Sequence, residues 1–273
     1  MTTPVPSSMT LAGCRAVVTG SSSGIGRAIA WEFAASGADV VIHAGRRRER
    51  AEQVAEEVRT LGREVRVLLC DLADPDAAEK FAADAWSTFG GVDIWVNNAG
   101  ADVLTGEAAR WSFDDKLQRL WQVDVLGTMR LSRTIGERMK RAAAPSNDER
   151  QLPVILNVGW DQATQGMAGD SGEMFGTIKG AVMAFTKSLA QTLAPHVRVN
   201  CLAPGWIRTA WGDEASTYWR TRAERESLLG RWGTPEDVAR AACFLASPAA
   251  SFISGQIVPI NGGFRYGDAA KSD

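Results

Sequence analysis

The sequence lacks the features that would indicate a secreted, membrane-spanning or metal-binding protein. Its four cysteines lie far apart without a CxxC pair, which favours buried thiols over disulfides or zinc ligands. No apolar run reaches 18 residues, so no membrane-spanning helix is expected. The first ten residues lack the basic stretch and apolar run of a secretory signal. We therefore expect a cytoplasmic protein without a metal site.

A strong excess of one charge is also absent. The net charge is −2 and the isoelectric point is about 5.8, which argues against a nucleic-acid or membrane-surface partner and favours a small-molecule one. Apolar residues make up 45% of the 273 residues, enough for the core of one α/β domain. We expect a flexible N-terminal arm over residues 1–10, the domain over 11–265 and a C-terminal tail over 266–273.

Short apolar runs alternate with longer helical patterns along the domain. Most of these runs contain few polar residues, which is typical of strands covered on both faces. Such alternation predicts a doubly wound parallel sheet with helices on both faces, a single-domain Rossmann fold. The seven expected strands are residues 15–20, 39–44, 64–70, 92–97, 153–159, 197–203 and 256–260.

A glycine-rich turn, "TGSSSGIG", follows the first expected strand and precedes a helix. At Gly20, Gly24 and Gly26 the absence of Cβ atoms lets a pyrophosphate approach the backbone. Free N–H groups at the helix start would then bind the anion. The spacing is GxxxGxG rather than GxGxxG, so a turn that needs glycine only for its shape is the alternative.

The turn resembles the cofactor motif of the short-chain dehydrogenase/reductase (SDR) family in its compact single-domain form. "CDL" (70–72), "NNAG" (97–100), "APGWIRT" (203–209) and "NGG" (261–263) match further landmarks of that family in order. The resemblance spans roughly residues 10–265 and implies a seven-stranded Rossmann sheet that binds a nicotinamide dinucleotide. It also implies a homotetramer or homodimer, paired through the helix that carries Lys179 and through the last strand.

NADP(H) is favoured over NAD(H) by the end of the second expected strand. Ala44 and Gly45 stand where an NAD-preferring site usually has a carboxylate. Arg46 or Arg47 could instead bind a 2′-phosphate, although basic residues in the first turn of a surface helix are also common. The cofactor residues expected from the turn, the arginines and the resemblance are Gly20, Ser22, Ser23, Gly24, Ile25, Gly26, Arg46, Arg47, Asp71, Leu72, Asn98, Ala99, Gly100, Lys179, Pro204, Gly205, Ile207 and Thr209.

The sequence departs from the family at three of the four active-site positions, which are Asn, Ser, Tyr and Lys in the family. The tyrosine position is Phe175, and Lys179 one helical turn later is retained. The serine position is Trp160 or Asp161, and the asparagine position is Asp124. Because a phenyl ring cannot donate a proton, the ordinary ketone–alcohol mechanism needs another proton source.

Two hypotheses account for these substitutions. In the first, Lys179, Asp161 and Asp124 form the catalytic group of a reductase that acts on a C=O bond or a cationic C=N bond, and a buried Asp161 has a raised pKa. In the second, the protein binds NADP(H) as a scaffold, a regulator or a non-redox lyase. The retained cofactor motif and Lys179 favour the first. Each substituted residue could also be purely structural.

Residues 205–233 occupy the place of the family's substrate lid and contain four tryptophans. We expect Trp160, Phe175 and Trp206 to contact a small, aromatic or cyclic substrate, because aromatic walls favour flat apolar or cationic ligands. Several arginines in the same segment leave a negatively charged substrate open. Residues 171–173 are interpreted as a helix N-terminal signal, with a Ser or Asp cap.

Overall fold

A single seven-stranded parallel sheet forms the centre of the computed structural model, which describes residues 10–143, 152–209, 212 and 216–265. The strand order is β3-β2-β1-β4-β5-β6-β7, which confirms the doubly wound Rossmann sheet expected from the sequence. The strands are β1 (Arg15–Val18), β2 (Asp39–Ala44), β3 (Val65–Leu69), β4 (Ile94–Asn97), β5 (Val154–Val158), β6 (Arg198–Pro204) and β7 (Ile257–Ile260).

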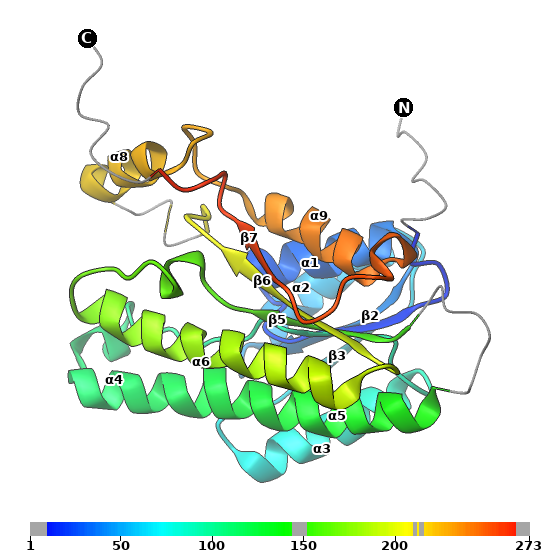
Figure 1. Ribbon diagram of the computed structural model, residues 1–273. Coiled ribbons are helices and arrows are strands. Elements are labelled where there is room, and N and C mark those ends of the chain that lie inside the picture. Colours follow the sequence, from blue (N-terminus) through cyan, green and yellow to red (C-terminus); the bar gives the residue numbers. More distant parts are fainter. Residues whose placement is uncertain (1–9, 144–151, 210–211, 213–215, 266–273) are drawn as a thin grey trace.

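Helices cover both faces of the sheet (Figure 1). One layer contains α1 (Gly24–Ala35), α2 (Arg48–Arg59) and α9 (Pro235–Ala246); the other contains α3 (Pro75–Thr88), α5 (Thr128–Ala142) and α6 (Asp170–Leu193). Each layer packs on its own apolar cluster, and β5 and β6 are buried along their whole length. Two-sided burial explains why the strand sequences are continuous apolar runs rather than alternating ones.

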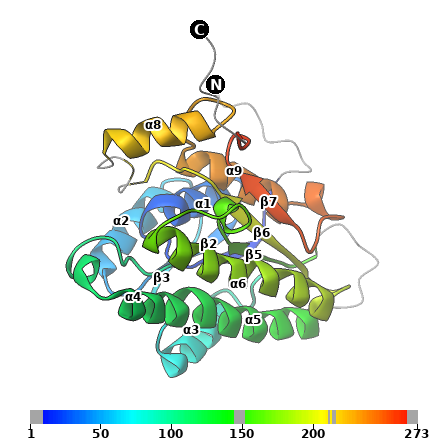
Figure 2. The ribbon, with the colours of Figure 1, turned by 60° about the vertical axis from the view of Figure 1, so that its left-hand side comes forward.

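The strand order reverses at the β1–β4 pair. Strands β2 and β3 lie on the β1 side of this pair, and β5, β6 and β7 lie on the β4 side. Ligands of open α/β sheets bind in the crevice at such a point, at the carboxyl ends of the strands. Helix α8 (Thr217–Glu226) lies beyond the carboxyl ends of the strands, outside both helix layers (Figures 1 and 2). The short elements near the crevice are α4 (Phe113–Leu120), a π-helix (η3, Trp121–Gly127) and the 3-10 turns η2 (Glu107–Arg110) and η4 (Asp161–Ala163). The 3-10 turn η5 (Pro248–Ala250) follows α9 and lies near the amino end of β6.

Some expectations fall on residues that the structure does not describe. Except for Thr10, the expected arm lies outside the described residues, as do the tail and residues 210–211 and 213–215 of the expected lid. None of the described helices combines the length and hydropathy that crossing a bilayer requires.

Candidate active site

The glycine-rich turn leaves a row of backbone donors open at the start of α1. Gly20 and Gly24 have φ of +64° and +55°, the left-handed region that glycine adopts without strain. Ser23 is the N-cap residue, but its side chain makes no capping hydrogen bond. Among the described residues, the N–H groups of residues 22–26 have no acceptor. This geometry is an anion-binding cradle at a helix N-terminus.

His43, near the end of β2, holds the glycine-rich turn in place through a hydrogen bond. Its Nδ1 accepts from the Gly20 N–H at 2.9 Å, and its Nε2 lies 3.0 Å from the Cys70 carbonyl oxygen. Because Nδ1 is an acceptor, Nε2 carries the proton and donates to Cys70. Burial lowers the pKa of His43 to about 4, so the ring is neutral at pH 7. This role was not predicted; the signal was a histidine in an otherwise apolar strand.

The residues after β4 support the other side of the turn. The Asn98 side-chain amide donates to the carbonyl oxygens of Thr19 and Gly20 at 3.0 and 3.2 Å. Thr19 Oγ1 accepts from the backbone N–H groups of Asn98 and Ala99. The "NNAG" run therefore braces the cradle with its side chain and backbone.

At the end of β3, Asp71 joins two arginines. Arg46 Nη2 lies 3.3 Å from one carboxylate oxygen, and Arg119 Nη2, from α4, lies 3.1 Å from the other. Burial alone would raise the pKa of Asp71, but a hydrogen bond from the Ala73 N–H and both guanidinium groups hold it below its usual value. The sequence did not predict Arg119. Arg47 is exposed, and Leu72 is buried.

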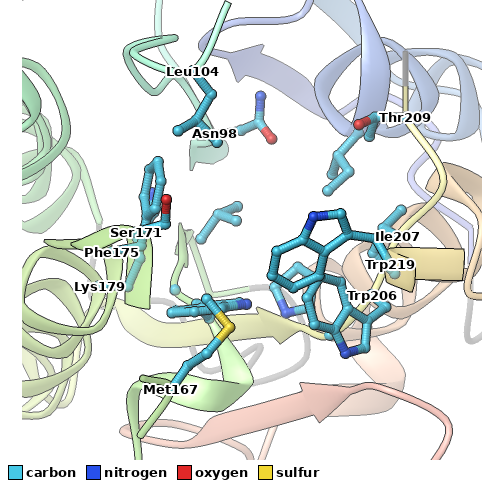
Figure 3. A pocket seen from close by; sticks show the side chains of 16 residues that line it. Asn98, Leu104, Met167, Ser171, Phe175, Lys179, Trp206, Ile207, Thr209 and Trp219 are labelled. Atoms are coloured by element: carbon cyan, nitrogen blue, oxygen red, sulfur yellow. The ribbon is translucent and has the colours of Figure 1, made fainter. Parts of the chain in front are cut away.

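A cavity of about 410 Å³ opens beyond the cradle. Ser171, Phe175 and Lys179, at successive turns of α6, form one wall, and Trp206 and Trp219 lie opposite (Figure 3). The remaining lining residues are Ile25, Asn98, Leu104, Val158, Gly159, Trp160, Met167, Pro204, Gly205, Ile207 and Thr209. The structure thus brings together Lys179, the three expected substrate residues and much of the expected cofactor set.

The two residues that stand for the family's serine and tyrosine make an apolar corner. The rings of Trp160 and Phe175 meet edge to face, with centroids 6.5 Å apart. Of the two residues expected at the serine position, Trp160 is the one on the cavity wall. Neither ring carries a group that can release a proton to a substrate at neutral pH.

Lys179 is held by a buried carboxylate. Its Nζ lies 2.9 Å from Asp124 Oδ2, and Asp124 is 2% exposed. The π-helix η3 places this carboxylate, whose other oxygen accepts from the Ala101 N–H at 2.8 Å. A Cβ at Gly100 would lie 2.8 Å from Asp124 Oδ2, so the glycine makes room for the carboxylate. Asp124 therefore compensates the positive charge of Lys179, which lines the cavity.

Asp161 does not line the cavity. Its Oδ2 accepts from the Asn261 side-chain amide at 3.0 Å, and its Oδ1 has no partner among the described residues. Burial raises the pKa of Asp161 to about 6, and Glu226 adds to the rise. The raised pKa agrees with expectation, but a carboxyl that does not line the cavity is not placed for direct proton transfer to a substrate there.

Two tryptophans of the expected lid contact Glu226 and Arg222 of α8. Trp206 Nε1 donates to Glu226 Oε2 at 2.7 Å, and Arg222 Nε donates to Glu226 Oε1 at 2.6 Å. The Arg222 guanidinium also lies over the rings of Trp206 and Trp219, 5.7 and 5.3 Å from their centroids. These contacts attach α8 to the segment that follows β6.

The helix start expected at residues 171–173 is confirmed, with Glu173 in the first turn of α6, but the expected Ser or Asp cap is wrong. Helix α6 begins at Asp170, and its N-cap is Gly169, at φ +91°. Ser171 lies inside the helix, and its side chain lines the cavity instead (Figure 3). Glycine took the cap position because the chain there needs a positive φ.

Sequence and structure comparisons place this site in a known family. The family model described as enoyl-(acyl carrier protein) reductase matches residues 20–265. The chain belongs to the short-chain dehydrogenase/reductase family. This SDR is 32% identical to tropinone reductase-like 3 of Erythroxylum coca over 250 residues, which cover 91% of this chain and 92% of the relative.

Solved SDR structures match over nearly the whole chain. A 7α-hydroxysteroid dehydrogenase complexed with NADH and 7-oxoglycochenodeoxycholic acid has a TM-score of 0.83 at 29% identity, covering 94% of this chain and 96% of that one. The Pseudomonas aeruginosa RhlG/NADP complex has a TM-score of 0.84 at 27% identity, covering 95% and 99%. The protein is an oxidoreductase of the SDR type.

Proposed function

We propose that this SDR is an NADP(H)-dependent reductase of a C=O or C=N bond in a small, flat, mainly apolar substrate, aromatic or cyclic. The observation that supports it most is one continuous site: an open anion cradle leads into a cavity walled by aromatic rings and Lys179. Among the described lining residues, the one with a charged side chain, Lys179, is paired with Asp124, which favours a substrate without a negative charge.

The residues present fit a nicotinamide dinucleotide. The N–H groups of residues 22–26 would bind its pyrophosphate, and Ile25, Ile207 and Thr209 line the cavity between cradle and substrate wall. Lys179 would hold the nicotinamide ribose, as the family resemblance implies. Bound in the reduced form, the cofactor would supply a hydride.

Arg46 is proposed to bind the 2′-phosphate of NADPH. It already lies beside Asp71 at the end of the sheet crevice, and no carboxylate closes β2. We expect Arg46→Ala to weaken NADPH binding about tenfold or more, because a hydrogen bond between charged groups contributes about 1.5–3 kcal/mol. NADH binding should be unchanged. Calorimetric titration of both cofactors measures this, with Arg47→Ala as the matched control; equal losses for both cofactors would contradict it.

Catalysis without the tyrosine suits a substrate that needs little proton donation. A cationic C=N bond forms no oxyanion when it is reduced, and the aromatic walls accept a planar cation. Lys179 and Asp124 are proposed to act as one ion pair that orients the cofactor side of the cavity. Asp161 remains a candidate acid, but only through a rearrangement that turns its carboxylate toward the cavity.

A catalytically lapsed reductase is the second candidate. The observation that favours it is the hydrocarbon corner of Trp160 and Phe175, where the family has two hydroxyl groups. Such a protein would bind NADP(H) and serve as a scaffold, a regulator or a non-redox lyase.

One assay separates the two candidates. NADPH is mixed with a panel of aromatic ketones and cyclic imines, and its absorbance is followed while cofactor binding is measured in parallel. Turnover of any panel member supports the reductase, and turnover confined to imines indicates C=N reduction. Binding of NADPH without turnover across the panel favours the lapsed enzyme.

A further inference from the structure

We infer that Ser171 is the substrate-binding hydroxyl of the cavity, and that it donates a hydrogen bond to a single acceptor atom of the substrate. The inference rests on the proposed function for the chemical class of the substrate, a flat and mainly apolar carbonyl or imine. Ser171 lies two turns before Lys179 and one before Phe175 on α6, and all three line the same wall (Figure 3).

The other polar side chains of the cavity are already engaged or lie elsewhere. Apart from the indole N–H groups of Trp160, Trp206 and Trp219, four polar side chains among the described residues line it: those of Asn98, Ser171, Lys179 and Thr209. The Asn98 amide group donates to two backbone carbonyls of the turn. Lys179 is paired with Asp124. The Thr209 methyl group would lie 3.7 Å from a Cβ at Gly24, which places Thr209 at the cofactor end.

Among these four side chains, the Ser171 hydroxyl is the group left for the substrate. Among the described residues it forms no hydrogen bond, and it neither caps α6 nor supports the fold through a polar contact. A hydroxyl in an apolar cavity gives specificity, because a ligand acceptor placed there replaces its hydrogen bonds to water.

The position also compensates for the substitution at 175. Residues four apart on a helix share a face, so Ser171 presents its hydroxyl one turn from the ring of Phe175. Trp160 removes the other family hydroxyl and meets that ring edge to face. The hydroxyl that binds the substrate thus stands at position 171 of α6 instead of position 175. Trp160 and Phe175 form the apolar wall against which a flat ligand would stack.

The test compares two ligands of nearly the same shape, 1-tetralone and tetralin, of which only the first carries an acceptor. Their affinities for the full-length chain are measured by calorimetry without cofactor, so turnover plays no part. We expect the unaltered chain to bind the ketone more tightly than the hydrocarbon. Ser171→Ala should lower ketone affinity about two- to tenfold, the range for one net hydrogen bond, and leave tetralin affinity unchanged.

Two controls complete the design. Ser188→Ala removes a hydroxyl from an exposed site on the same helix and should change neither affinity. Ser171→Thr keeps a hydroxyl and should retain the preference for the ketone. The inference is overturned if the unaltered chain binds both ligands equally, or if Ser171→Ala affects both or neither. A selective loss without any NADPH turnover would support Ser171 and refute the proposed reductase.

Discussion

At the scale of single residues, the active site differs from that of the family by substitutions that remove hydroxyl groups and add a carboxylate. Asp124 stands where the family has an amide, and its carboxylate compensates Lys179 at 2.9 Å. In the family, the lysine lowers the pKa of the tyrosine, and that effect depends on its positive charge. A tyrosine restored alone at position 175 would therefore meet a lysine whose charge is already balanced.

The first prediction concerns this coupling. Phe175→Tyr alone should give a phenol with a nearly ordinary pKa and little gain in ketone reduction. Combined with Asp124→Asn, which still accepts from the Ala101 N–H, the phenol pKa should fall by about one unit or more, since the lysine charge is then uncompensated. Tyrosinate absorbance against pH measures the pKa, with the parent chain subtracted for Tyr218 and Tyr266. The same phenol pKa in both variants would contradict the proposed compensation.

A second prediction concerns the buried carboxyl of Asp161. Burial raises its pKa from 3.8 to about 6 in the folded chain, so folding favours the protonated form. This contribution to stability is complete below pH 3.8 and is lost as pH rises through about 6. Asp161→Asn, which cannot ionise, should therefore be more stable than the parent above pH 6, by about 2–3 kcal/mol.

Urea unfolding at several pH values checks this difference. The two free energies of unfolding should converge as the pH falls below 3.8, where Asp161 is protonated in both the folded and the unfolded chain. A constant difference at every pH would mean that the substitution acts through packing rather than through ionisation. His43 titrates in both proteins, so its own contribution cancels in the comparison.

At the scale of elements, helix α8 is joined to the domain through polar contacts to one carboxylate, that of Glu226. Helix α8 joins the segment after β6 through Glu226, which accepts from Trp206 Nε1, Arg222 and, at 3.4 Å, Gln162 Nε2. Few buried apolar residues support it, since Ala223 is the buried residue within α8. Local opening of such an element depends strongly on single hydrogen bonds.

Trp206→Phe should therefore loosen α8 while keeping the aromatic wall. The lost hydrogen bond involves a charged acceptor, so amide exchange in residues 217–226 should speed up about tenfold. Hydrogen exchange followed by mass spectrometry measures it. Trp31→Phe, on the exposed face of α1, is the control and should leave α8 unchanged. Unaltered exchange in the Trp206 variant would show that packing alone holds the helix.

The sequence predicted the elements better than their contacts. The strands follow from apolar runs that must be buried on both faces, so residues 39–44 coincide with β2. The catalytic positions came from the resemblance to the SDR family. The contacts of His43, Arg119 and Ser171 could not be predicted, because they depend on which elements meet at the sheet edge. Ser171 was misread because Gly169, with its positive φ, took the cap.

At the scale of the whole molecule, the described sheet ends in two edge strands, β3 and β7, and the β7 edge bears on assembly. Strand β7 has no neighbour beyond it among the described residues, and Phe252, close before it in the chain, is 103% exposed. An open edge beside exposed aromatic side chains is a common site of association. This supports the expectation that the protein is a homodimer or homotetramer, pairing through α6 and β7.

Light scattering after size-exclusion chromatography tests the assembly. The unaltered chain should have twice or four times the mass of one chain. Phe252→Asp should give a smaller assembly, because a charge cannot be buried in an apolar contact without a partner. A monomeric mass for the unaltered chain would refute the expectation.

The imidazole under the glycine-rich turn ties together the carboxyl ends of β1, β2 and β3 before any ligand arrives. Because this turn is already ordered, it loses little conformational entropy when a dinucleotide binds. The binding free energy of its contacts is therefore not reduced by the cost of ordering the chain. Coenzyme-free and coenzyme-bound crystals should accordingly superimpose at this turn, and any motion on docking should be confined to the lid.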